Sequence, residues 1–322
     1  MKTLIPAALA ALALSGGNAL AQTADYPNRA IRLVVPYAPG GTADIVARTV
    51  GQKLAQSLGQ SVIVENRPGA SGVIGWNFVA RSAPDGYTLL ATETGFSMAG
   101  AVLPKLPFDP KTDFTHLSIA AKSPFVMVTP ADSQYTSVAQ FVADTRAKPG
   151  TLNYGSAGSG SSTHLAGEWF QSLTGTRLMH IPYKGGSSAI QALMANEVQM
   201  AFPAIASTLE FIKTGKLKAL MVTSAQRSAV LPDVPSAPEA GVPDMIGSNW
   251  FAFSVPSGTP ADITQKLSQA INEAIGDDAV KTRLNAIGID TAGTSPADAQ
   301  RFVDQEIQDW QNLVTRAGIS VQ

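Results

Sequence analysis

Short apolar runs alternate with helical patterns along most of this chain, and the alternation restricts the fold more than any other feature. Between the runs, apolar residues recur at helical spacing, as at Ile45, Val46, Val50 and Leu54. Such an alternation favours an α/β fold with mostly parallel sheets flanked by helices. The strand candidates are, in order, IRLVVPY, SVIVENR, YTLLAT, LSIAA, FVMVTP, TLNYGS, LMHIPYK, VQMAFPA, KALMVTS and FAFSVPS.

Two joints interrupt this alternation and indicate two lobes. Around Ser123 and Pro124 two strand-like runs follow one another with no helix between them, and residues 227–244 hold too many prolines for a regular element. If the chain crosses from one lobe to the other at each joint, the result is a two-lobed clamshell. Residues 22–123 and 228–322 then form one lobe and residues 124–227 the other. We expect the ligand in the cleft between the lobes and hinge bending near residues 123–125 and 223–227.

The N-terminus has the pattern of a secretory signal peptide. Lys2 is followed by the apolar run LIPAALAALAL and by an Ala-x-Ala ending at Ala21, so residues 1–21 are predicted to be cleaved and the mature chain to begin at Gln22. The apolar run is too short to span a bilayer. The sequence contains no cysteine, which excludes disulfides, thiol chemistry and the acceptor of a lipoprotein anchor. We therefore expect a soluble periplasmic protein.

The composition excludes a nucleic-acid footprint. The 23 Lys and Arg are scattered and are balanced by 24 Asp and Glu, whereas nucleic-acid binding requires a basic cluster. No cofactor or metal is predicted, because the sequence contains neither phosphate-loop nor dinucleotide glycine patterns, and no His pair at ligand spacing.

Catalysis has little support in the sequence. The G-x-S-x-G elbow is not matched, and His116 and His180 fit a structural role best, because neither has a clustered partner. His164 is different, since it opens a helix after a serine-rich turn. A hydrolase that uses a serine with His164 stays open as an alternative, because members of a triad need not be near one another in sequence.

Three turns rich in glycine and hydroxyl residues each follow a strand candidate and precede a helix. They are PYAPGGTAD, YGSAGSGSSTH and PYKGGSSA. Small residues let a ligand approach the backbone there, and the first amides of a helix point at it with the positive end of the helix dipole. One such turn would be an ordinary connection, but three in matching positions across both lobes predict an anion site.

The ordered blocks of the chain closely resemble the Bug family, the periplasmic solute-binding receptors of tripartite tricarboxylate transporters. The blocks include YPNRAIRLVVPYAPGGTADIVAR, VENRPGASGVIG, APDGYTLL, LNYGSAGSGSSTHLAGEWF, PYKGGSSAIQALM and VPSGTPADI, and they span essentially the whole mature chain. The resemblance implies a two-lobed, non-enzymatic, monomeric receptor of the periplasmic-binding-protein type. It would close over a small carboxylate solute and deliver it to membrane permease subunits. A ligand-binding subunit for a sensor system stays open as an alternative.

The resemblance also implies a set of ligand-binding positions. In the first lobe these are Tyr37, Ala38, Pro39, Gly40, Gly41, Thr42 and Asp44, and in the second lobe Ser156, Ala157, Gly158, Ser159, Ser162, Thr163 and His164. The cleft wall would be completed by Thr92, Glu93, Thr94, Tyr183, Lys184 and Gly185. Asp44 could instead complement the dipole of its own helix, Lys184 could be a surface residue, and Tyr183 could simply pack between the lobes.

One departure from the family pattern suggests a preference for the solute. Phe202, Pro203 and Ala204 stand where many members carry polar side chains, and Phe96 replaces a small or polar residue. A cleft edged by Phe96, Phe202 and Ala204 would favour a ligand with an apolar or aromatic body behind its carboxylate, because unpaired polar groups would be costly there.

Overall fold

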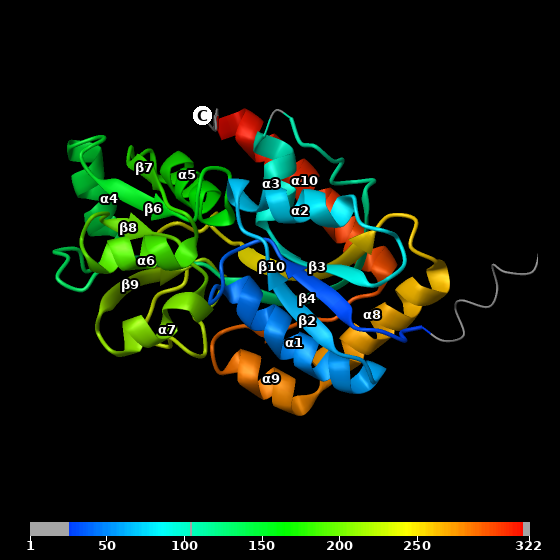
Figure 1. The fold of residues 1–322 in the computed structure, drawn as a ribbon. Coiled ribbons are helices and arrows are strands. Elements are labelled where there is room, and N and C mark those ends of the chain that lie inside the picture. Colours follow the sequence, from blue (N-terminus) through cyan, green and yellow to red (C-terminus); the bar gives the residue numbers. More distant parts are fainter. Residues whose placement is uncertain (1–25, 104, 318–322) are drawn as a thin grey trace, which may run out of the picture.

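The computed structural model describes residues 26–103 and 105–317, which form two lobes (Figure 1). Each lobe is a sheet covered by helices, as the alternation of strands and helices predicted. The predicted signal peptide, residues 1–21, lies outside the described residues. Within the described ranges, no helix combines the length and the apolar character needed to cross a membrane.

The first lobe contains a sheet of six strands in the order β11-β4-β10-β3-β1-β2. Its strands are β1 (Ile31–Val35), β2 (Val62–Asn66), β3 (Thr88–Glu93), β4 (Phe114–Pro124), β10 (Ser248–Pro256) and β11 (Asp290–Thr291). Its helices are α1 (Thr42–Leu58), the 3-10 turn η1 (Ala70–Gly72), α2 (Val73–Ala80), α3 (Gly95–Val102), α8 (Ala261–Gly276), α9 (Asp278–Asn285) and α10 (Pro296–Ala317).

Helices cover both faces of the first sheet, so its strands are apolar on both sides. Leu33 packs with α1, α8 and α9, whereas the next residue, Val34, packs with α2, α3 and α10 on the other face. This is the alternation of side chains along a strand, and it explains why IRLVVPY reads as a continuous apolar run.

The second lobe contains a sheet of five strands in the order β7-β6-β8-β5-β9. Its strands are β5 (Val126–Pro130), β6 (Asn153–Ser156), β7 (Met179–Pro182), β8 (Met200–Ala201) and β9 (Leu217–Val222). Its helices are α4 (Val138–Ala147), α5 (Ser162–Thr174), α6 (Gly186–Met194) and α7 (Ile205–Lys213). Met127 and Val128 of β5 again enter the cores on opposite faces.

The sheets are mixed, which corrects the expectation that they are mostly parallel. Strand β1 pairs in parallel with β2 and β3, and β6 pairs in parallel with β7 and β8. The strands next to the crossings pair antiparallel, β10 with β4 in the first lobe and β5 with β9 in the second. The cause is the path of the chain, because β4 runs towards the second lobe and β10 returns from it.

Thr223, which follows β9 in the second lobe, is hydrogen-bonded both to the outgoing crossing at Phe125 and to the return crossing near Gly247. The amide of Phe125 donates to Thr223 Oγ1 at 2.9 Å, and the amide of Thr223 donates to the carbonyl of Phe125 at 2.9 Å. The Thr223 hydroxyl also donates to the carbonyl of Gly247 at 2.7 Å. The outgoing and returning segments are therefore fastened together at the point where the lobes join.

The return crossing lies later in the chain than the predicted boundary at residue 228. Leu231 and Val234 pack into one core of the second lobe, and Val242 and Met245 pack into the other. The proline-rich stretch forms no regular element, but its apolar side chains are still buried against the second sheet. By packing, the second lobe therefore extends to about Gly247, and the boundary at residue 228 is wrong.

Candidate functional site

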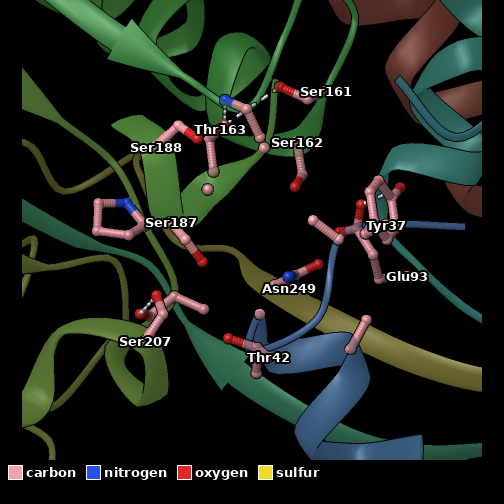
Figure 2. Close-up of a pocket in the computed structure, with 18 of the residues that line it drawn as sticks. Tyr37, Thr42, Glu93, Ser161, Ser162, Thr163, Ser187, Ser188, Ser207 and Asn249 are labelled. Carbon is pink, nitrogen blue, oxygen red and sulfur yellow. Dashed lines mark hydrogen bonds between the residues drawn. The ribbon is translucent and has the colours of Figure 1, made fainter. Parts of the chain in front are cut away.

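A cavity of about 100 Å³ lies between the lobes (Figure 2). Its walls combine small apolar and hydroxyl side chains with backbone from both lobes. The first lobe contributes Tyr37, Ala38, Gly41, Thr42, Ala43, Glu93, Asn249 and Phe251. The second lobe contributes Ala157, Ser161, Ser162, Thr163, Lys184, Gly185, Gly186, Ser187, Ser188, Pro203, Ala204 and Ser207. Among the described residues no group of His, Asp and Glu side chains could hold a metal ion.

The N-termini of four helices from both lobes line this cavity. The lining includes the starts of α1, α5, α6 and α7, at Thr42, Ser162, Gly186 and Ala204. Helices α1, α6 and α7 have no side-chain hydrogen bond at their N-caps, so cap side chains leave their first amides free. Free amides and the positive ends of the helix dipoles favour an anion in the cavity.

Hydroxyl groups hold the loop before α5 in place. The Ser161 hydroxyl donates to the carbonyl of Gly158 at 2.6 Å and accepts from the amide of His164 at 3.3 Å. Thr163 Oγ1 accepts from the amide of Ala157 at 2.8 Å. The loop is thereby ordered by its own side chains, which presents the start of α5 to the cavity without needing a ligand.

A buried acid stands on the first-lobe wall of the cavity. The Tyr37 hydroxyl donates to Glu93 Oε1 at 2.6 Å, while Glu93 Oε2 has no hydrogen-bond partner. Burial raises the pKa of Glu93, although the nearby hydroxyls of Tyr37 and Ser162 partly oppose this by favouring the charged form. A Cβ atom at Gly95 would lie 2.5 Å from Glu93 Oε1, so a glycine is needed beside the pair.

Two histidines pack behind the second-lobe loop rather than in the cavity. The rings of His164 and His180 stack with their centroids 3.9 Å apart, and His180 Nε2 lies 2.6 Å from Ser156 Oγ. The Gly160 amide donates to His164 Nδ1 at 3.0 Å. Burial lowers the pKa of each histidine to about 4, so both are neutral at neutral pH.

Residues 46–319 match the family described as the tripartite tricarboxylate transporter family receptor. The chain belongs to this receptor family. BugT of Bordetella pertussis is 36% identical to the receptor over 311 residues, which cover 96% of this chain and 95% of BugT. A protein from the tcbD-tcbE intergenic region of Pseudomonas sp. (strain P51) is 37% identical over 306 residues, which cover 94% of this chain and 91% of that protein. The resemblance to the Bug family is therefore confirmed.

Solved structures of related receptors share the fold. The periplasmic binding protein BugD superposes with a TM-score of 0.88 at 31% identity, covering 92% of this chain and all (100%) of BugD. Rpa4515 of Rhodopseudomonas palustris, solved with adipate, gives a TM-score of 0.88 at 34% identity. The match covers 92% of this chain and 99% of Rpa4515. MatC of the same organism, solved with bound malate, gives a TM-score of 0.86 at 31% identity. The match covers 90% of this chain and 100% of MatC. The predicted two-lobed periplasmic-binding-protein fold is confirmed.

Many of the positions predicted for the receptor's site line the cavity. They are Tyr37, Ala38, Gly41, Thr42, Glu93, Ala157, Ser162, Thr163, Lys184, Gly185 and Ala204. Sequence reasoning missed Ala43, Ser161, Gly186, Ser187, Ser188, Ser207, Asn249 and Phe251. The recognised turn PYKGGSSA already contained Ser187 and Ser188, so carrying the site on to the end of that turn would have found them.

Other predicted positions support the walls without lining the cavity. They are Pro39, Gly40, Asp44, Thr92, Thr94, Ser156, Gly158, Ser159, His164 and Tyr183. Asp44 accepts from the Gly40 amide at 3.0 Å and from Arg48 Nε at 3.0 Å, so it holds the loop before α1. Thr92 Oγ1 accepts from Trp76 Nε1 at 2.9 Å, and Tyr183 directs its hydroxyl to Glu197 at 3.3 Å. Contact of these residues with a solute stays a prediction, and for Asp44 and Tyr183 the hydrogen bonds fit the alternative supporting roles.

The predicted aromatic edge of the cleft is also wrong. Phe96 is 0% exposed and packs edge-on against Trp76 and Phe114, at centroid distances of 5.5 and 5.1 Å. Phe202 is likewise 0% exposed and packs against Phe170 at 5.4 Å. Both rings enter the hydrophobic cores, because the apolar area that they bury there stabilises the lobes. The prediction of an aromatic solute therefore loses its basis.

Proposed function

We propose that this receptor captures a small carboxylate solute in the periplasm and delivers it to the membrane permease of a tripartite transporter. The observation that carries the proposal is the meeting of four helix N-termini around one small cavity. The relatives support it, since Rpa4515 was solved with adipate and MatC with bound malate.

The carboxylate sits on the second-lobe side of the cavity. Its oxygens accept hydrogen bonds from the first amides of α5 and α6 and from the hydroxyl of Ser187, which line the same wall. Thr42, at the start of α1 in the first lobe, faces this wall across the cavity. A bound solute thus touches both lobes and stabilises the arrangement in which they are close together.

The compartment and the delivery step follow from the family and the N-terminus. Residues 1–21 direct export and are removed, and the mature monomer carries the solute through the periplasm to its permease. Rotation of the lobes about the two crossings, at Phe125 and near Gly247, which are both hydrogen-bonded to Thr223, opens and closes the cavity.

The position of His164 supports a binding role rather than hydrolysis. This residue was the candidate base, but its ring lies outside the cavity wall and its Nδ1 accepts a hydrogen bond from the Gly160 amide. The serine–His164 pair of the hydrolase alternative is therefore not assembled at the cavity.

Isothermal titration calorimetry on the purified mature chain tests the proposal. We expect saturable 1:1 binding of at least one member of a panel of mono-, di- and tricarboxylates and amino acids, with the solute recovered unchanged. The carboxamide counterpart of each binder is the control, and it is expected to bind at least tenfold more weakly because it lacks the negative charge. Turnover of the solute, or equal binding of the carboxamides, would contradict the proposal.

A further inference from the structure

Glu93 has a free acceptor atom that its own protein does not use. The residue is 5% exposed, its Oε1 is engaged by the Tyr37 hydroxyl at 2.6 Å, and its Oε2 is buried with no hydrogen-bond partner. Buried polar atoms in native proteins are nearly always paired, because an unsatisfied one loses its hydration without compensation. Since Glu93 lines the cavity, a group on the solute can supply the missing partner.

Within residues 26–103 and 105–317, no cation pairs with this carboxyl group. Each element packed around Glu93 presents a neutral hydrogen-bonding group that favours the charged carboxyl group without neutralising it: Tyr37 from the loop after β1, Ser162 from α5, Gly95 from α3 and Asn249 from β10. In the described part of the chain, none of the ion pairs formed by Lys or Arg includes Glu93. Among the described residues that line the cavity, the only other charged side chain is that of Lys184, on the opposite lobe.

The cavity therefore has two chemically different sides. The helix N-termini of the second lobe offer hydrogen-bond donors and positive dipole ends, whereas Glu93 on the first lobe offers an acceptor that can carry negative charge (Figure 2). Burial raises the pKa of Glu93, whereas the hydrogen bond from the Tyr37 hydroxyl favours the ionised form, and an ammonium beside Oε2 would favour that form further. A second carboxylate placed beside Glu93 would instead be repelled or would require a proton.

We propose that Glu93 is a specificity-determining residue that accepts a hydrogen bond from an ammonium group of the solute, so that the receptor selects amino-carboxylates over plain carboxylates of the same size. The inference rests on the proposed function, because the carboxylate of the same solute occupies the helix N-termini. The ammonium supplies the counter-charge that the protein does not provide, and it pairs Oε2. The Tyr37–Glu93 hydrogen bond holds the carboxyl group in position to receive it.

Two matched series of solutes test this proposal by calorimetry: propionate, lactate and alanine, and succinate, malate and aspartate. Within each series only one substituent changes, from hydrogen to hydroxyl to ammonium. We expect the best-binding ammonium member to bind at least tenfold more tightly than its unsubstituted counterpart. Equal or tighter binding of the unsubstituted or the hydroxyl member, or no binding of either amino acid, overturns the proposal. Saturable binding of plain carboxylates in that case would leave the proposed function standing.

The variant Glu93→Gln tests whether Glu93 causes the preference for the ammonium-bearing solute. It keeps the shape of the side chain and an acceptor for Tyr37 but removes the charge, and we expect the preference for the ammonium member to fall to within about threefold. Glu210→Gln is the control, because it removes an exposed carboxylate from α7 with the same change in net charge, and it should keep the full preference. A Glu93→Gln variant that folds and still discriminates tenfold would overturn the proposal.

Proton uptake in the unaltered receptor gives a test that does not depend on the variant folding. Calorimetry in buffers of different ionisation enthalpy measures the protons taken up on binding. We expect the amino-carboxylate to bind without proton uptake, and with release of protons at pH values where Glu93 is protonated in the free receptor, because its ammonium pairs with ionised Glu93. Uptake of about one proton with the ammonium member would show that Glu93 binds it in the protonated form, and would overturn the proposal.

Discussion

The hydroxyl of Ser71 in the first lobe donates a hydrogen bond of 2.6 Å to the backbone carbonyl of Ser159 in the second lobe. Ser71 belongs to the short turn η1 and has a left-handed backbone, with φ of 53°. The lobes approach so closely there that a Cβ atom at Gly158 would lie 2.9 Å from Ser71 Oγ. This contact bridges the two lobes and so contributes to the arrangement in which the cavity is enclosed.

Replacing Ser71 by alanine should weaken solute binding. The substitution removes one hydrogen bond between the lobes, worth about 1 kcal/mol, so we expect affinity to fall by about threefold to tenfold, mainly through faster release. Calorimetry and stopped-flow fluorescence measure the two effects. Ser82→Ala is the matched control, since its hydroxyl donates at 2.8 Å to Phe78 within the first lobe and should leave affinity unchanged.

Replacing Gly158 by alanine should separate the lobes. Its φ of 127° is strained for any other residue, and the added methyl group would collide with Ser71 Oγ. We expect a loss of about 1–3 kcal/mol in the free energy of unfolding and a larger radius of gyration in small-angle scattering. Gly150→Ala separates the two causes, because that glycine also has a positive φ, 75°, but nothing within 4 Å of its Cβ position. A Gly158→Ala protein as compact as the parent would contradict the prediction.

Removing a single amide at the start of α5 should reduce affinity without unfolding the helix. Ser162 is the first residue of α5, where proline is tolerated, and the preceding Ser161 has the extended backbone, with ψ of 161°, that proline requires. We expect Ser162→Pro to bind its carboxylate about tenfold to a hundredfold more weakly than Ser162→Ala, since both lack the hydroxyl and only the first lacks the N–H. Equal affinities for the two variants would show that this amide does not contact the solute.

Acid should destabilise the receptor between about pH 6.5 and 4. Burial lowers the pKa of His164 and His180 to about 4 in the folded protein, so the unfolded chain binds more protons in this range. Stability is therefore complete above about pH 6.5 and declines as the pH falls. Urea unfolding at several pH values measures the decline, which should be shallower in His180→Gln. A urea concentration at the unfolding midpoint that increases as the pH falls towards 4 would contradict the predicted loss of stability.

Much of the fold could be predicted because its strands are buried on both faces. Val34 and Leu33 are both apolar, so the run around them stands out in the sequence whichever face each one takes. The direction of the strands could not be predicted in the same way. Strand β10 is antiparallel to β4 because the chain returns from the second lobe, and no local pattern records that path.

The site could be located in part because its backbone has a local signature. Glycine and hydroxyl residues before a helix mark Gly41 and Ser162 directly, and both line the cavity. Asn249 and Ser207 come from β10 and α7, which only the tertiary fold brings there, so nothing near them in the sequence marks them. Phe202 was misplaced for a related reason, because neighbouring residues at the end of a strand face opposite sides and the sequence does not say which side is the core.

The hydrogen bonds that join both crossings, at Phe125 and near Gly247, to Thr223 bear on how a solute can leave. Two linkers tied side by side bend as one, so the lobes are expected to rotate about a single axis instead of sliding or twisting past each other. The cavity then opens only at the rim away from that axis. The solute would enter and leave the cavity through the same opening. A receiving membrane protein would have to separate the two lobes at that rim to release the solute.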